Sequence, residues 1–128
     1  MEVKLGGINY NLTELLRHRN YSQKLYEGTV NEAVDDTKDD PFDVGPFKEG
    51  TFFLNVSAFV GTNVIVTILT LDPVSLEWHV IATFETLTDV GKDMKPVTAN
   101  LGEKIAVVVT PTGAGAKTLT VGANFKIM

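Results

Sequence analysis

The sequence predicts an all-β protein: an antiparallel β-sandwich of the jelly-roll or immunoglobulin-like kind, with a short N-terminal helix or arm. From Thr51 onward, apolar residues alternate with small polar ones in five segments, at 51–58, 63–71, 77–84, 103–110 and 117–125. Breaks that contain Gly or Pro, such as Asp72-Pro73 and the stretch 111–115, separate them. Short strands with turn signals about every 8–12 residues are typical of sandwiches and barrels.

The first 43 residues have a different pattern, so we assign 1–43 to an N-terminal arm and 44–128 to the sandwich domain. Asn11-Leu12-Thr13-Glu14 has the spacing of a helix capping box, which predicts a helix of about two turns over 12–19. A helix this short is marginal alone in water and needs a surface to pack on. Residues 22–28 are a candidate strand within the arm.

An acidic segment follows, from Glu32 to Glu49, interrupted by prolines and a glycine. Carboxylate oxygens are the ligands that calcium takes, so the run Asp35–Asp40 raises the hypothesis of a weak cation site. Thr37 and Lys38 interrupt the run, and it does not match the EF-hand loop. The pattern favours an exposed acidic loop.

The strands themselves predict which residues face the core. In the last strand, Leu119, Val121, Ala123 and Phe125 should point inward, since side chains alternate between the two faces of a sheet. In the strand at 51–58, the inward set is Phe52, Leu54, Val56 and Ala58, with Phe53 and Phe59 on the other face. The strands at 64–71 and 104–109 are apolar on both faces, which predicts cover by the N-terminal segment or by another subunit.

Composition limits the classes of function. A chain of 128 residues and 13.9 kDa fits one domain. The net charge of −5 disfavours nucleic-acid binding, and the absence of cysteine excludes disulfides and thiolate sites. No apolar run approaches the roughly 20 residues that span a bilayer, and the first residues lack the pattern of a signal peptide. We expect a protein made in the cytoplasm that binds neither nucleic acid nor membrane.

A search for catalytic chemistry predicts no enzyme, no cofactor and no metal site. His18 and His79 lie far apart in the sequence with no metal-ligand spacing. Gly113-Ala114-Gly115 lies between two strands, which predicts a hairpin turn and not a phosphate-binding loop. Ser57 and Ser75 belong to no nucleophile motif. Carboxylate pairs for glycoside hydrolysis remain open, but nothing singles out Glu77, Glu85 or Glu103.

The strand motifs from residue 54 resemble those of small β-sandwich structural proteins of tailed bacteriophages. The matching segments are LNVSAFVGT (54–62), VIVTI (64–68), WHVIATF (78–84), GEKIAVVVT (102–110) and TLTVGANF (118–125). The resemblance covers about 80 residues and keeps their order and spacing. One departure is Leu71-Asp72-Pro73-Val74-Ser75, where the pattern of these proteins would have a longer, polar, Gly-rich turn before the tryptophan.

The resemblance implies a virion component, namely a head decoration or cement protein that binds the major capsid protein or other virion proteins. Such a protein is expected to be a homo-oligomer, and lattice symmetry favours a trimer. The N-terminal helix is the predicted docking element, because it combines apolar and arginine side chains suited to interfaces. Its predicted contact residues are Leu12, Leu15, Leu16, Arg17 and Arg19.

Three alternatives stay open. Within the same class, the protein could belong to the phage tail, neck or fibre. From another class, a carbohydrate-binding β-sandwich module would place aromatic side chains on an exposed face. The candidate aromatics are Trp78, Tyr21, Tyr26, Phe53 and Phe59. The third alternative is an enzyme such as a glycosidase.

Overall fold

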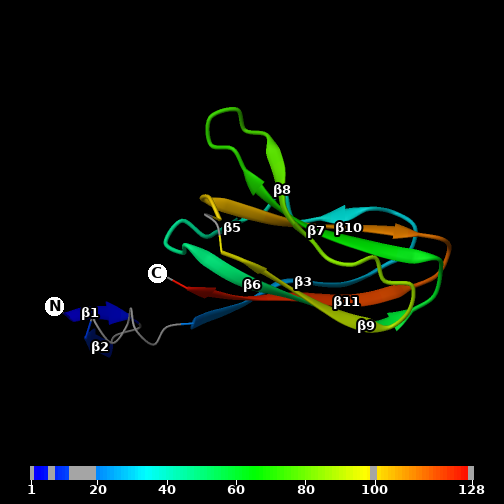
Figure 1. Cartoon of the computed structure of the whole chain (residues 1–128), viewed down its shortest axis with the longest axis horizontal. Coiled ribbons are helices and arrows are strands. Elements are labelled where there is room, and N and C mark those ends of the chain that lie inside the picture. Colours follow the sequence, from blue (N-terminus) through cyan, green and yellow to red (C-terminus); the bar gives the residue numbers. More distant parts are fainter. Residues whose placement is uncertain (1, 6–7, 12–19, 99–100, 127–128) are drawn as a thin grey trace.

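The computed structural model describes residues 2–5, 8–11, 20–98 and 101–126. Every regular element in these ranges is a β-strand, and two antiparallel sheets pack against each other, so the predicted all-β sandwich is confirmed (Figure 1). A separate hairpin of β1 (Glu2–Leu5) and β2 (Ile8–Asn11) precedes the sandwich. The predicted helix over 12–19 lies outside the described residues.

The two sheets, called here sheet I and sheet II, each combine strands that are distant in sequence. Sheet I has the order β3 (Asn20–Val30), β11 (Lys117–Lys126), β6 (Glu49–Phe59), β9 (Gly91–Val97). Sheet II has the order β4 (Asp35–Asp36), β10 (Lys104–Thr112), β7 (Asn63–Leu71), β8 (Trp78–Thr83). The short strand β5 (Phe42–Asp43) also pairs with β10, so β4 and β5 form one interrupted edge of sheet II.

This strand order is that of a jelly roll, in which two Greek keys form a pair of facing sheets. Nearly every connection within the described sandwich crosses from one sheet to the other. The exception, once β4 and β5 are taken as one edge, is the β7–β8 hairpin, which stays within sheet II. Of the two sandwich types expected from the sequence, the structure therefore adopts the jelly roll.

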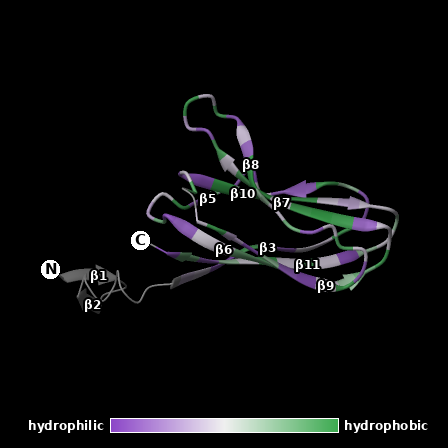
Figure 2. Ribbon diagram, viewed as in Figure 1, coloured by the Kyte–Doolittle hydropathy of each residue, from purple (hydrophilic) through white to green (hydrophobic). Residues whose placement is uncertain are grey.

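The core lies between the sheets and follows the alternation of the strands. Leu119, Val121, Ala123 and Phe125 of β11 are buried as predicted. They face buried residues of β7 and β10, of which β7 is hydrophobic over most of its length (Figure 2). On the outer side of these two strands, Leu69 and Ala106 are also buried within this chain.

The alternation in β6 breaks at its end, and two sequence predictions there are wrong. Phe52, Leu54 and Val56 point inward as expected, but Ala58 is exposed and Phe59 packs against the core. The cause is a β-bulge opposite Thr118 and Leu119, which shifts the register by one residue. An extra residue in a strand turns the following side chains to the opposite face.

The sandwich begins at β3, which corrects the predicted boundary between arm and domain at residues 43 and 44. β3 pairs with β11 along its whole length, from Asn20 opposite Lys126 to Val30 opposite Lys117. Leu25 and Tyr26 are buried although they are consecutive, because the register of the pair shifts beside them. This irregularity hides the period-two pattern that identifies a strand in the sequence.

The acidic segment is mostly exposed, as predicted, and the carboxylates near its start, Asp35 and Asp36, have specific partners. Tyr26 Oη donates a hydrogen bond to Asp35 Oδ2 at 2.8 Å, and burial, together with this carboxylate, raises the pKa of Tyr26 above its ordinary value. Asp36 Oδ1 accepts from the Lys38 N–H at 3.0 Å. Asp35 and Asp36 thus anchor this segment to the sandwich as part of an edge strand.

One charged side chain, that of Lys117, is buried among the described residues. Lys117 has 0% exposure, and its ammonium donates to the carbonyl oxygens of Asn31 (3.0 Å), Gly113 (2.8 Å) and Gly115 (3.0 Å). The Phe59 ring, turned inward by the bulge in β6, lies 5.7 Å from the same nitrogen. The cation thereby ties the end of β3 to the turn between β10 and β11.

Candidate protein-interaction site

The most prominent surface feature is the hairpin of β7 and β8, which projects from sheet II (Figure 1). Its strands pair from Thr67 opposite Thr83 to Leu71 opposite Trp78, with residues 72–77 forming the loop. Both strands belong to sheet II, and β8 is its edge strand. The loop between them therefore does not cross to the other sheet, as most of the other connections do. The hairpin is therefore free to contact another molecule.

Hydrophobic side chains are exposed on this hairpin. The exposed fractions are 90% for Val74, 69% for Leu76 and 61% for Val80. Trp78 is half-buried and lies two residues before Val80, so both point to the same side of β8. A hollow of about 200 Å³ separates the loop from the start of β10 and is lined by Leu71, Pro73, Leu76, Glu103 and Lys104. Apolar side chains exposed on a projecting element make this hairpin the candidate protein contact surface.

Asp72 holds the loop in one conformation. Its Oδ1 accepts from the N–H groups of Val74 (2.9 Å) and Ser75 (3.4 Å), and its Oδ2 accepts from Ser75 Oγ (2.8 Å). The Leu76 N–H donates to the Asp72 carbonyl at 2.8 Å. These hydrogen bonds, that of Val74 first, lower the pKa of Asp72 from its ordinary value, and the charge of His79 contributes a little. The apolar tip is thus presented in a preformed shape.

Leu76 adopts a left-handed backbone conformation, with φ 61°. This region favours glycine and asparagine, and for other residues it costs roughly 1–2 kcal/mol. The side chain recovers little of that cost by burial, since most of its surface is exposed. A strained residue with an exposed apolar side chain is consistent with a contact made outside this chain.

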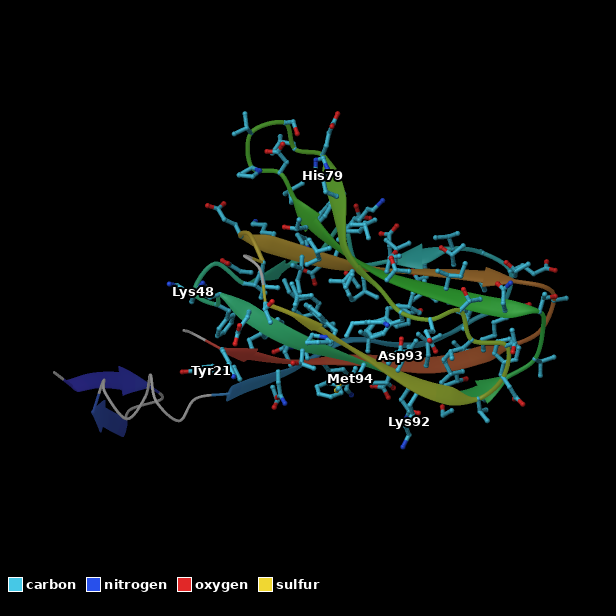
Figure 3. All side chains as sticks on the ribbon, in the orientation of Figure 1. Tyr21, Lys48, His79, Lys92, Asp93 and Met94 are labelled. Atoms are coloured by element: carbon cyan, nitrogen blue, oxygen red, sulfur yellow. The ribbon has the colours of Figure 1, made fainter. Side chains whose placement is uncertain are left out.

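The structure places the predicted site residues in different situations. Leu12, Leu15, Leu16, Arg17, Arg19 and His18 lie outside the described residues. His79 is exposed on β8, beside the loop (Figure 3). In the part of the chain that the structure describes, no group of three or more His, Cys, Asp or Glu side chains could hold a metal ion. No helix in the same ranges is long and apolar enough to cross a membrane.

The five candidate aromatics do not form one surface. Tyr26 is buried, while Tyr21 and Phe59 pack against the core. Trp78 lies on β8 of sheet II, whereas Phe53 is 40% exposed on the outer face of sheet I. Phe53 is the aromatic of this set that presents a large exposed surface on a sheet.

The comparisons with known proteins add no family. No protein-family model matches the sequence, and no curated protein matches it. Among solved structures, the chain is similar to one described as "Crystal structure of PirA", with a TM-score of 0.41 and 9% identity over 86% of this chain and 98% of that chain. A likeness this weak supports no functional argument.

The hairpin tip was not identified as a site from the sequence, although one signal pointed to it. At Leu71-Asp72-Pro73-Val74-Ser75 the expected resemblance to phage structural proteins predicts a longer, polar, Gly-rich turn, which this sequence lacks. In the structure this departure forms the loop that exposes Val74 and Leu76.

Proposed function

We propose that this protein is a non-enzymatic virion structural protein that decorates or stabilises a phage capsid through protein–protein contacts. The observation that carries the proposal is the preformed β7–β8 hairpin, whose exposed tip residues are Val74 and Leu76. The jelly-roll order of the strands agrees with it at the level of the fold, since such sandwiches recur in viral capsid proteins. The resemblance of residues 43–125 to phage structural proteins adds to this support.

In this proposal the partner is the major capsid protein or another protein of the head, and the hairpin enters an apolar depression on it. Burying Val74 and Leu76 removes apolar surface from water, which favours association. The loop loses less entropy on binding than an unstructured one would, because its own hydrogen bonds already order it. A homo-oligomer, such as a trimer on the capsid lattice, would present several hairpins at once and raise the apparent affinity.

Sedimentation with purified phage heads and tails tests the proposal. The wild-type protein should pellet with heads, while Val74→Asp and Leu76→Asp should bind at least about tenfold more weakly, because a charge must be desolvated at the contact. Val90→Asp is the matched control, since Val90 is an exposed valine on the β8–β9 connection, away from the hairpin tip. It should bind as the wild type does.

The other outcomes are equally informative. Binding to tails but not to heads would assign the protein to the tail, neck or fibre and keep the virion role. If Val90→Asp weakens binding to heads and the two loop variants do not, the contact lies away from the hairpin. Absence of binding to either particle would overturn the proposal.

A further inference from the structure

The outer face of sheet I has a different chemistry from the hairpin. Three rows of outward-facing residues cross its four strands, as the strand registers show. From β3 to β9 the rows are Ser22–Asn124–Thr51–Pro96, Lys24–Gly122–Phe53–Met94 and Glu27–Thr120–Asn55–Lys92. Lys92 and Met94 lie on the side of β9 that faces away from sheet II (Figure 3). The exposed Phe53 ring therefore lies between Gly122 and Met94, with hydroxyl and amide groups in the rows on either side.

Gly122 keeps one side of the Phe53 ring open. It lies directly opposite Phe53, with Lys24 beyond it on β3, so no side chain stands between them. A Cβ at Gly122 would meet only the Gln23 carbonyl oxygen, at 3.6 Å, and its φ lies outside the left-handed region. The fold therefore does not require glycine here, although glycine weakens a strand. Gly122 lies at the register shift between β3 and β11, a place where strands often carry glycine, and the missing side chain leaves the space beside Phe53 open.

Two hollows adjoin the Phe53 ring and together cross the sheet. One, of about 380 Å³, includes Lys24, Thr120 and Gly122 in its lining, and the other, of about 460 Å³, includes Met94 and Pro96. Both are lined by Phe53 and Asn124. Both are open to solvent, and the one beside Gly122 is shallow, so a ligand would lie across the sheet surface and not in an enclosed cavity.

The polar groups of this face are suited to a neutral ligand with many hydroxyls. Ser22 Oγ donates to Asn124 Oδ1 at 2.6 Å, which orients an amide whose nitrogen carries two donors. Lys24 forms an ion pair with Glu27, and Lys126 forms one with Glu49 at 3.5 Å. Because these cations are locally balanced and the chain carries −5 overall, a phosphate or sulfate group gains little here.

We propose that the outer face of sheet I binds a neutral oligosaccharide, with a pyranose ring stacked on Phe53 in the trough kept open by Gly122. The face of an aromatic ring is electron-rich and attracts the weakly positive C–H groups on one side of a sugar ring. The Asn124 amide and the hydroxyls of Thr51 and Thr120 supply hydrogen bonds to the sugar hydroxyls. The site lies on the sheet opposite the hairpin and does not depend on the proposed capsid attachment.

A glycan array followed by calorimetric titration tests this site. The array carries neutral glucan, galactan, mannan and chitin oligosaccharides beside sulfated and sialylated ones. The wild-type protein should bind at least one neutral series, and Phe53→Ala should weaken that binding at least about tenfold. Gly122→Val, which fills the trough, should do the same without loss of thermal stability, since the Cβ has room and valine is favourable in strands.

Controls separate binding from folding. Val80→Ala alters an exposed residue of sheet II and should bind as the wild type does. Gly122→Ala adds only a Cβ and should fall between the wild type and Gly122→Val, which keeps the test decisive if the valine variant does not fold. Failure to bind any neutral glycan, binding to anionic glycans alone, or neutral binding that neither Phe53→Ala nor the Gly122 variants change would overturn the proposal.

Discussion

The β10–β11 turn and the β7–β8 loop are each organised by one charged side chain. They differ in which residues adopt a left-handed backbone conformation. In the turn between β10 and β11, Lys117 is buried and donates to three carbonyl oxygens. In the loop between β7 and β8, Asp72 accepts from two N–H groups and a hydroxyl near the surface. One charge closes the sandwich, and the other shapes a projecting tip.

The residues in the left-handed region show the difference most clearly. Around Lys117 they are glycines, Gly113 (φ 85°) and Gly115 (φ 131°), which adopt this conformation at no steric cost. In the hairpin loop the corresponding conformation is taken by Leu76. In the β10–β11 turn, glycine is the residue that adopts the left-handed conformation most easily. In the β7–β8 loop a leucine occupies that conformation at a cost, which agrees with a role of its side chain in a contact.

The largest expected effect is at Lys117. Lys117→Met keeps the length of the side chain but removes the buried ammonium, and leaves three carbonyl groups without this donor. We expect a loss of about 3 kcal/mol in the free energy of unfolding, measured by denaturant titration. Lys126→Met is the control, because Lys126 is an exposed lysine of the same strand with one long ion pair, and it should change stability by less than about 0.5 kcal/mol. Equal effects of the two substitutions would contradict the structural role of Lys117.

A smaller effect of opposite sign is expected at Leu76. Leu76→Gly relieves the left-handed strain, so the free energy of unfolding should stay the same or rise by up to about 1 kcal/mol. Binding to phage heads should nevertheless weaken, because the apolar tip is lost. Stability and binding thus change in opposite directions. A clear loss of stability would instead show that Leu76 serves the packing of its own chain.

The smallest effect concerns acid pH. The folded pKa of Asp72 is lowered, so its hydrogen bonds stabilise the loop above the ordinary carboxyl pKa, and that stabilisation is lost as the pH falls through the lowered value. Chemical shifts of the Val74 and Ser75 amides, followed by NMR, should move with a midpoint below that of an unperturbed aspartate. The turn around Lys117 should show no change over the same range. A midpoint at or above the ordinary value would contradict the loop geometry.

Much of the sandwich could be predicted from the sequence, because period-two alternation is a direct consequence of burial on one face. The five predicted strands correspond to β6, β7, β8, β10 and β11. β9 was missed since Lys92, Asp93, Lys95 and Pro96 give an edge strand no apolar pattern. The bulges that turn Phe59 inward and bury Leu25 beside Tyr26 depend on pairing with a distant strand, which local sequence does not specify.

The candidate sites were less predictable. A lysine at the start of a strand is ordinarily exposed, and only the convergence of three carbonyl groups explains the burial of Lys117. Phe53 was recognised as an outward aromatic, but the importance of Gly122 depends on the register that places it opposite the ring. The exposure of Val74 and Leu76 depends on the hairpin remaining within sheet II, which is a property of the topology.

The pairing of Asn20 with Lys126 has a practical consequence for engineering. The chain enters the sandwich and leaves it on directly opposed residues, whose Cα atoms are about 5 Å apart in an antiparallel pair. A fold with such adjacent ends can be grafted as a cassette into a surface loop of an unrelated carrier. The graft would leave the hairpin tip uncovered, because the tip projects from sheet II whereas both junction residues belong to sheet I.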